Sequence, residues 1–222
     1  MSAAKHILVT RFSSMGDVAM TVPIIKALLV QNPHLSVTVV SRPAFAAFFQ
    51  GIERLDFFPA DLKVKLKGFA GIVKLFNDLR KHRPFDAIAD LHDTLRTKIL
   101  RNLFRISGKK VIHIDKGRAE KKLLTRFPNK VLKPLKRTTE RYADVFRQLG
   151  FPVKLDYLLH KEEAVLANDI TKITGTKDQP WIGITPFAQY KGKTYPVEKM
   201  EEVINHVLNY SQDSIDSHSL NK

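Results

Sequence analysis

The chain has 222 residues, of which 44% are hydrophobic, so it can form one large domain or one domain and part of another. It contains no cysteine, which excludes disulfides and thiolate zinc sites, and its eight histidines are scattered without metal-ligand spacing. No stretch approaches the roughly 18–20 apolar residues that span a bilayer, and no secretory signal opens the sequence, so we expect a cytoplasmic protein.

The formal net charge of +15 is concentrated in one stretch of the sequence. Residues 61–147 contain 24 Lys or Arg and 9 Asp or Glu, and the rest of the chain is neutral. This surplus predicts an anionic partner, which can be a phosphorylated lipid, a nucleic acid or a phosphorylated small molecule. The basic runs have few aromatic residues and no nucleic-acid-binding motif, which argues against nucleic acid. A solvated face that only aids solubility is the alternative interpretation.

The first part of the chain alternates predicted strands and helices. Short β-branched or apolar runs typical of buried strands occupy residues 6–10, 36–40, 85–90 and 111–114. Between them, helical periodicity marks residues 18–29, 69–76 and 95–103. Because strands separated by helices are typical of βαβ units, we predict an α/β fold with a doubly wound, Rossmann-like parallel sheet.

The remaining elements are weaker, and the pattern restarts near residue 180. In chain order we predict an irregular basic segment at 115–137, a helix at 139–149 ending at Gly150, a linker strand at 151–160, a short helix at 162–174, a strand at 181–185 and a helix at 197–208. We therefore expect a domain at 1–160, a linker helix at 161–178, the incomplete start of a second domain at 179–210 and a disordered tail at 211–222.

The loop after the first strand carries the clearest chemical signal. It reads Arg11-Phe12-Ser13-Ser14-Met15-Gly16-Asp17 and lies at the carboxyl edge of the sheet, where α/β proteins bind ligands. Gly16 permits a tight turn, and the carboxylate of Asp17 can accept a proton from a bound hydroxyl. The simpler interpretation is that Asp17 is the N-cap of the following helix. The loop is neither a dinucleotide-binding nor a Walker phosphate loop.

Three segments of the sequence share the pattern of one known family. They are residues 7–28 with the loop above, residues 86–97 (Asp-Ala-Ile-Ala-Asp-Leu-His-Asp and Arg96-Thr97), and residues 182–196 (Ile-Gly-Ile-Thr-Pro-Phe-Ala-Gln and Lys193-Thr194-Tyr195-Pro196). Together they resemble the family 9 glycosyltransferases, the heptosyltransferases of lipopolysaccharide synthesis. The resemblance implies a GT-B fold, with the first domain on the acceptor side and the second binding the donor. It implies transfer of heptose from ADP-heptose to the lipopolysaccharide inner core, with inversion and without a metal or other cofactor.

The resemblance also assigns roles to individual residues. Asp17 takes the position of the catalytic base, and Arg96 matches a basic position that faces the acceptor. Lys193 matches a lysine at the donor diphosphate, where its charge would stabilise the leaving group. The remaining predicted contacts are Ser13, Ser14, Gly16 and His92 with the acceptor, and Thr185 and Gln189 with the donor. For His92, capping of the next helix is an equally good interpretation.

The sequence departs from the family pattern at three points. Phe187 stands where the family has glycine, and Tyr195 replaces a tryptophan. The later Asp-x-Gly-x-x-His motif that grips the nucleotide sugar is not in the sequence, so we expect a shortened copy of the enzyme, inactive in one interpretation. The alternative function is a non-catalytic module that binds an anionic glycolipid or membrane surface. In either case the basic stretch predicts peripheral contact with the anionic inner membrane.

Overall fold

The computed structural model describes residues 5–61, 66, 68–155, 168–175, 182–188 and 190–219, with side chains up to residue 209. The chain divides into two compact units, Met1–Lys161 and Glu162–Lys222. We describe each unit by itself.

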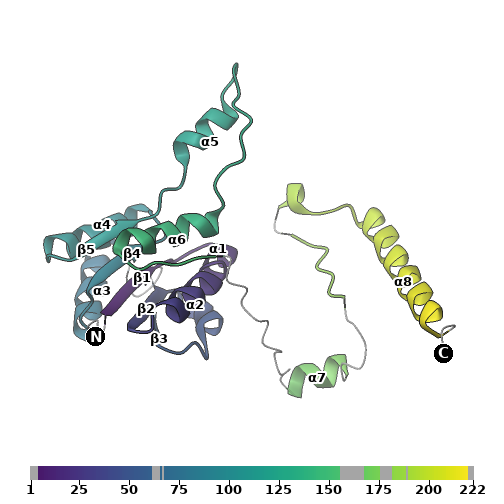
Figure 1. Ribbon diagram of the computed structural model, residues 1–222, viewed down its shortest axis with the longest axis horizontal. Coiled ribbons are helices and arrows are strands. Elements are labelled where there is room, and N and C mark those ends of the chain that lie inside the picture. The colour runs from purple at the N-terminus through teal and green to yellow at the C-terminus, as the bar shows by residue number, and fades with distance from the viewer. Residues whose placement is uncertain are drawn as a thin grey trace. The chain divides into compact units, whose positions relative to one another are not determined.

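The first unit is built on a five-stranded parallel sheet (Figure 1). Its strands are β1 (Lys5–Thr10), β2 (Leu35–Ser41), β3 (Leu55–Pro59), β4 (Ala87–Asp90) and β5 (Lys110–His113). Their order is β3-β2-β1-β4-β5, and every neighbouring pair is parallel. The four strands expected from the sequence are confirmed, while β3 was not predicted. Its residues are only partly buried, and Asp56 and Pro59 interrupt the apolar pattern that marks the other strands.

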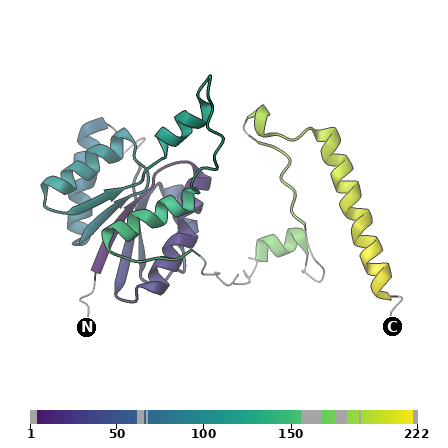
Figure 2. The same ribbon diagram turned by 45° about the horizontal axis from the view of Figure 1, so that its top comes forward.

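Helices cover both faces of this sheet, as Figure 2 shows. The helical elements of the first unit are α1 (Met15–Ala19), α2 (Thr21–Gln31), the 3₁₀ helix η1 (Pro43–Phe49), α3 (Gly68–His82), α4 (Leu95–Ile106), α5 (Arg118–Thr125) and α6 (Thr138–Leu149). Apolar residues of α2 and α6 form one core with β1 and β2. Those of α3 and α4 form a second core on the opposite face. This arrangement confirms the predicted doubly wound sheet, and its burial of apolar side chains on both faces is the main driving force for folding.

Between β5 and α6 the chain leaves the body of the unit as a projecting arm, which we define as residues 118–137 (Figure 1). The arm consists of α5 and an extended return, joined by a hydrogen bond of 3.1 Å from the Val131 amide to the Leu123 carbonyl. The prediction of irregular structure at 115–137 is wrong for α5. Its sequence from Arg118 to Thr125 consists mostly of good helix formers, and Gly117 precedes it in the left-handed conformation that permits the turn.

Two predictions about the end of the first unit can be compared with the structure. Helix α6 ends at Gly150, which has a φ of 99°, so the predicted glycine cap is confirmed. Residues 151–155 form no strand, in contrast to the predicted linker strand, because their backbone pairs with no neighbouring strand of the described sheet. Residues 156–160 lie outside the described part.

The second unit contains the helices α7 (Asn168–Thr174), η2 (Lys191–Lys193) and α8 (Val197–Ser219). The strand predicted at 181–185 is not formed at the described residues 182–185, where no partner strand is present to satisfy its backbone. Helix α8 continues to Ser219, beyond the end predicted at residue 208, and the disordered tail at 211–222 stays a prediction. No glycine or proline follows Pro196, and a polar sequence without such breakers can extend a helix.

Within the described residues, no helix is both long enough and apolar enough to pass through a bilayer.

Candidate functional site

The strand order places a switch point between β1 and β4. The chain runs outward in one direction from β1 to β3 and then returns to β4 and continues to β5 on the other side. The loops that leave the carboxyl ends of β1 and β4 therefore diverge at this point, and the space between such loops is where open α/β sheets bind ligands. The loop after β1 contains Ser13 and Ser14, and the loop after β4 contains His92 and Asp93.

Asp17 is the third residue of the short helix α1 and not its N-cap. The N-cap position is occupied by Ser14, and the Asp17 side chain instead accepts a hydrogen bond from the Arg11 guanidinium. About a third of the Asp17 side chain is exposed, whereas that of Arg11 is buried. The carboxylate is therefore oriented by a buried cation and still accessible to solvent, which is a suitable arrangement for a general base. The helix-cap interpretation is not what the structure shows.

Arg11 joins the two loops at the switch point. Its Nη1 donates to the Leu91 carbonyl at 2.7 Å, its Nη2 binds Asp17, and its guanidinium carbon lies 5.9 Å from the centre of the Tyr142 ring. The Tyr142 hydroxyl donates weakly to the backbone oxygen of Asp17 at 3.4 Å. Burial raises the pKa of Tyr142 to about 12, against the opposing effect of Arg11, so the phenol stays protonated as a donor.

Ser13 and His92 connect the same loops by a second contact. Their side chains are hydrogen-bonded, with 2.9 Å between Ser13 Oγ and His92 Nε2. Burial, aided by the nearby Arg11 charge, lowers the pKa of His92 to about 4, so the imidazole is neutral at pH 7. The N-cap of α4 is Thr94, whose amide donates to Thr97 Oγ1 at 2.9 Å. His92 therefore does not cap α4.

A pocket of about 300 Å³ opens beside this contact. Its lining residues are Phe12, Ser13, Arg42, His92, Thr94, Leu95 and Arg96. The structure thus brings together three of the residues predicted to bind the acceptor, namely Ser13, His92 and Arg96. Ser14, Gly16 and Asp17 belong to the same loop as Ser13 but do not line the pocket. With two guanidinium groups and an apolar wall, the pocket suits an anionic or polyhydroxylated ligand.

A buried ionic network supports the loop after β4. Asp90 and Asp93 both accept from Arg101 Nη1 of α4, at 3.1 and 3.0 Å, and all three side chains are at most a tenth exposed. Asp90 Oδ1 also accepts from Thr10 and from the amides of His92 and Asp93. Burial opposes the ionisation of Asp93, but the hydrogen bond and charge of Arg101 outweigh it and hold the pKa of Asp93 below its usual value.

Two non-glycine residues with positive φ flank the switch point. Ser14 has a φ of 55° and Asp93 has a φ of 44°. Such conformations cost about 1 kcal/mol or more each and gather at functional sites, where surrounding contacts hold them in place. Here Arg101 donates directly to Asp93, and Arg11 binds Asp17, three residues after Ser14 in the same loop.

The predicted donor residues belong to the second unit. Thr185 and Lys193 are exposed, and Lys193 Nζ lies 5.7 Å from the centre of the Tyr190 ring. Gln189 lies outside the described residues. Among the described residues, no three His, Asp or Glu side chains gather closely enough to hold a metal ion.

Sequence reasoning assigned no role to Arg11, Arg42 or Arg101. The sequence did contain a signal for Arg11. It follows the apolar run Ile7-Leu8-Val9 after a single residue, and an arginine that is buried beside such a strand needs an anionic partner. Arg101 lies three residues after Lys98 and four residues before Arg105 on α4, and nothing in this spacing distinguishes it from the exposed arginines of that helix.

Comparison with solved structures supports the fold. The chain is similar to a glycosyl transferase family 9 protein from Veillonella parvula DSM 2008, with a TM-score of 0.70 and 18% identity over 95% of this chain and 62% of that one. It is also similar to E. coli heptosyltransferase WaaC with ADP, with a TM-score of 0.54 and 16% identity over 91% of this chain and 64% of that one. These similarities confirm the predicted α/β fold of the GT-B type, and the chain spans under two thirds of either protein.

No curated protein matches the chain. The model of glycosyltransferase family 9 (heptosyltransferase) matches residues 72–212, which is more than half of the sequence. The match includes the resembling segments at 86–97 and 182–196, and the Asp17 loop lies before it. The chain belongs to glycosyltransferase family 9, the heptosyltransferases.

Proposed function

We propose that this chain is the acceptor-side part of an inverting glycosyltransferase that transfers heptose from ADP-heptose to the lipopolysaccharide inner core. The observation that carries the proposal is the Asp17 carboxylate, partly exposed at the switch point and oriented by buried Arg11. It shares its loop with Ser13, which lines the adjoining pocket. We further propose that the protein works in the cytoplasm, at the inner-membrane surface.

In the proposed reaction the acceptor sugar lies in the pocket, with one hydroxyl directed at Asp17. The Asp17 carboxylate takes the proton of that hydroxyl while the hydroxyl oxygen attacks the anomeric carbon of the donor. The new carbon–oxygen bond forms on one face of the sugar as the bond to the diphosphate breaks on the other, so ADP leaves and the configuration inverts. One carboxylate suffices for this single displacement, and a general base contributes about 10²–10⁴-fold to such a rate.

The other predicted residues take supporting roles in this proposal. Ser13 and neutral His92 offer hydrogen bonds to sugar hydroxyls, and Arg96 faces acidic groups of the acceptor. Ser14 and Gly16 shape the loop that presents Asp17. Lys193, with Thr185 and Gln189, contacts the donor diphosphate and stabilises the charge on the leaving ADP.

The test uses the purified chain, ADP-heptose and a Kdo–lipid A acceptor, with release of ADP and the mass of the product as readouts. We expect Asp17→Asn to lower the transfer rate by about 10²-fold or more, because the amide cannot accept the proton. Asp78→Asn is the matched control. Asp78 forms a surface ion pair with Lys74 on α3, and such pairs contribute little to stability.

Transfer by Asp17→Asn at the wild-type rate would contradict the base assignment. If neither protein transfers heptose but both bind the acceptor, the non-catalytic binding module becomes the better description. Acceptor binding is measured on the same samples. A variant that no longer binds the acceptor is thereby distinguished from one that binds it but lacks the catalytic base.

A further inference from the structure

The projecting arm is strongly basic along its whole length. Its twenty residues include eight Lys or Arg and one acidic residue, Glu120. Glu120 is engaged by Arg141 of α6 at 2.6 Å, while Arg118 pairs with Asp93 and Lys136 with Asp144. Within the described part of the chain, no ion pair is formed by the remaining arm cations, which are Lys121, Lys122, Arg126, Lys130, Lys133 and Arg137.

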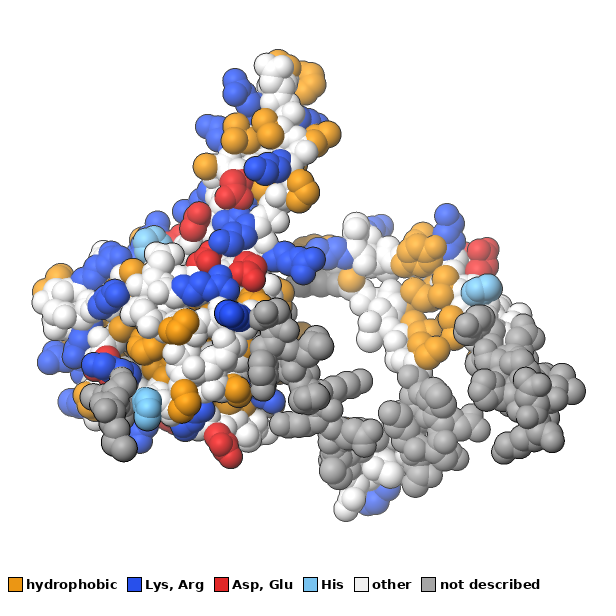
Figure 3. Space-filling model, in the orientation of Figure 1, with side chains coloured by type: hydrophobic (Ala, Val, Ile, Leu, Met, Phe, Trp, Pro, Cys, Tyr) orange, Lys and Arg blue, Asp and Glu red, His pale blue; other side chains and the backbone are white. Residues whose placement is uncertain are grey.

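Bulky apolar side chains are exposed among these cations. Phe127 is 89% exposed and Leu132 is 83% exposed, and Leu123 and Val131 are about half exposed. Figure 3 shows apolar and basic side chains interleaved along the arm. Helix α5 has no buried residue at all. A helix and turn that expose this much apolar surface within one projection indicate a surface that is covered by a partner.

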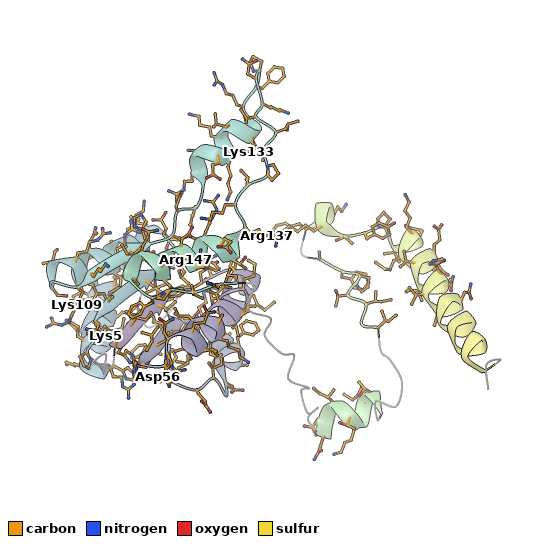
Figure 4. All side chains as sticks on the ribbon, viewed as in Figure 1. Lys5, Asp56, Lys109, Lys133, Arg137 and Arg147 are labelled. Carbon is orange, nitrogen blue, oxygen red and sulfur yellow. The ribbon has the colours of Figure 1, made fainter. Side chains whose placement is uncertain are left out.

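The combination of the two features favours one kind of partner. Side chains such as Phe127 and Leu132 insert at the boundary between headgroups and acyl chains, and flanking lysines and arginines bind the anionic headgroups. A nucleic acid would leave the aliphatic side chains without a function, and Phe127 is the only aromatic residue of the arm. In Figure 4, Lys133 and Arg137 lie on the arm, away from Lys109 and Lys5 on the body.

We propose that the arm docks on an anionic lipid bilayer, with Phe127 and Leu132 inserted at its surface and the surrounding cations on its headgroups. The root of the arm is tied to the switch point, because Arg118 Nη2 lies 3.1 Å from Asp93 Oδ2 and Lys116 donates to the Asp93 carbonyl at 3.1 Å. Docking through the arm therefore places the bilayer near the candidate site. This step rests on the proposed function, in which the acceptor is a lipid held in that bilayer.

The test is flotation of the full chain with two kinds of vesicle, one of phosphatidylcholine alone and one in which about a third of the lipid is phosphatidylglycerol. The anionic headgroups of the second kind give the surface a negative potential that attracts basic segments. We expect binding to the anionic vesicles that is lost at high salt. Lys130→Gln/Lys133→Gln should lower the partition coefficient roughly 25-fold, since each cation near such a surface contributes about fivefold. Phe127→Ser/Leu132→Ser should lower it about tenfold or more.

The matched controls are Ile106→Ser and Lys109→Gln, which change an equally exposed isoleucine and a lysine on the body of the unit. Equal losses in the controls and the arm variants, or equal binding to neutral and anionic vesicles, would overturn the proposal. So would a wild-type dimer that the Phe127→Ser/Leu132→Ser variant dissociates while vesicle binding is unchanged, since a second copy would then cover the arm.

Flotation requires neither donor nor acceptor, so it is independent of the transferase proposal. Asp17→Asn should float like the wild type. A chain that binds vesicles through its arm but transfers no heptose would disprove only the proposed function, and a chain that transfers heptose but ignores anionic vesicles would disprove only the arm.

Discussion

The switch-point loops and the projecting arm use the same residue types under opposite conditions. At the switch point, Arg11 and Arg101 are buried and their guanidinium groups bind carboxylates and carbonyls of neighbouring elements. On the arm, Arg126, Lys130 and Lys133 are exposed, and no ion pair of theirs is found among the described residues.

This difference separates charges that position other groups from charges available to a partner. A buried cation has lost its hydration and must be compensated by its protein partners, so it fixes their geometry. An exposed cation keeps its hydration and contributes little to folding, so its value lies in binding. Four variants test how burial separates these two regions, and they are ordered from the largest expected effect on stability to the smallest.

Arg101→Met should be the most destabilising of them. It leaves the carboxylates of Asp90 and Asp93, which are 1% and 8% exposed, without their shared cation. Removal of one partner from a buried ionic network costs about 3–5 kcal/mol, measured as the free energy of unfolding in urea. Arg105→Met is the control one turn later on α4, where the side chain is exposed, and should cost under about 0.5 kcal/mol. Equal costs would show that burial does not separate the two arginines.

The next effect is a loss of stability in mild acid that depends on His92. Its pKa is about 4 in the folded protein and 6.5 in the unfolded chain, so the unfolded chain binds more protons between these values. The free energy of unfolding should therefore fall by about 2–3 kcal/mol as the pH is lowered from 6.5 to 4, and be unaffected by this group above 6.5.

His92→Gln, which keeps a hydrogen-bonding group near Ser13, should remove this part of the pH dependence. His34→Gln is the control, because His34 is exposed and its substitution should leave the slope unchanged. Urea unfolding at several pH values between 4 and 7 provides the comparison, and identical slopes for wild type and His92→Gln would contradict it. The pKa of Asp93 is also lowered, so its stabilising contribution begins to be lost at the acid end of this range. That loss is common to the wild type and the variant, and the difference between their slopes therefore reports His92.

Gly117→Ala tests the root of the arm. Gly117 has a φ of 61°, and an added Cβ would lie 2.4 Å from Nη2 of Arg141, which is buried and holds Glu120. Gly108→Ala is the matched control, with a φ of 81° and open space around the position of its Cβ. Each substitution should lower the free energy of unfolding by about 1 kcal/mol, because alanine is strained in the left-handed conformation. Gly117→Ala should lower it by about 1–2 kcal/mol more, because Arg141 must move away from the added Cβ. Thermal denaturation of the pair measures the difference, which vanishes if Arg141 is not a fixed part of the root.

The sequence predicted those strands of the fold in which consecutive residues are buried. Strands β1, β2 and β4 are buried over most of their length, which leaves the continuous apolar or β-branched runs typical of parallel strands. The edge strand β5 has only Val111 buried, and the short run Val111-Ile112 with Ile114 identified it. The other edge strand, β3, is only partly buried, and Asp56 and Pro59 interrupt its apolar run, so it left no such pattern. Helix α8 is longer than the helix predicted at 197–208, because the sequence from Ser211 onward is polar and has no helical periodicity of apolar residues.

The sequence predicted where the candidate site lies better than it predicted the contacts between the residues of the site. The loop with Asp17 and the loop with His92 follow strands that the sequence identifies, and parallel strands bring such loops to one edge. The pairing of Arg11 with the Leu91 carbonyl and of Ser13 with His92 joins residues about eighty positions apart. Such contacts depend on strand order, which local patterns do not contain.

The smallest effect on stability is expected on the arm itself. Phe127 and Leu132 are 89% and 83% exposed, so their replacement by serine removes almost no buried apolar surface. The free energy of unfolding of Phe127→Ser/Leu132→Ser should remain within about 0.5 kcal/mol of the wild type, or rise slightly, in the absence of lipid. A loss of 2 kcal/mol or more, at the scale of about 25 cal/mol per Å², would mean that these side chains are buried in solution, by the second unit or by another copy. Anionic vesicles should stabilise the wild type and leave this variant unchanged, because a ligand raises the stability only of a folded state that binds it.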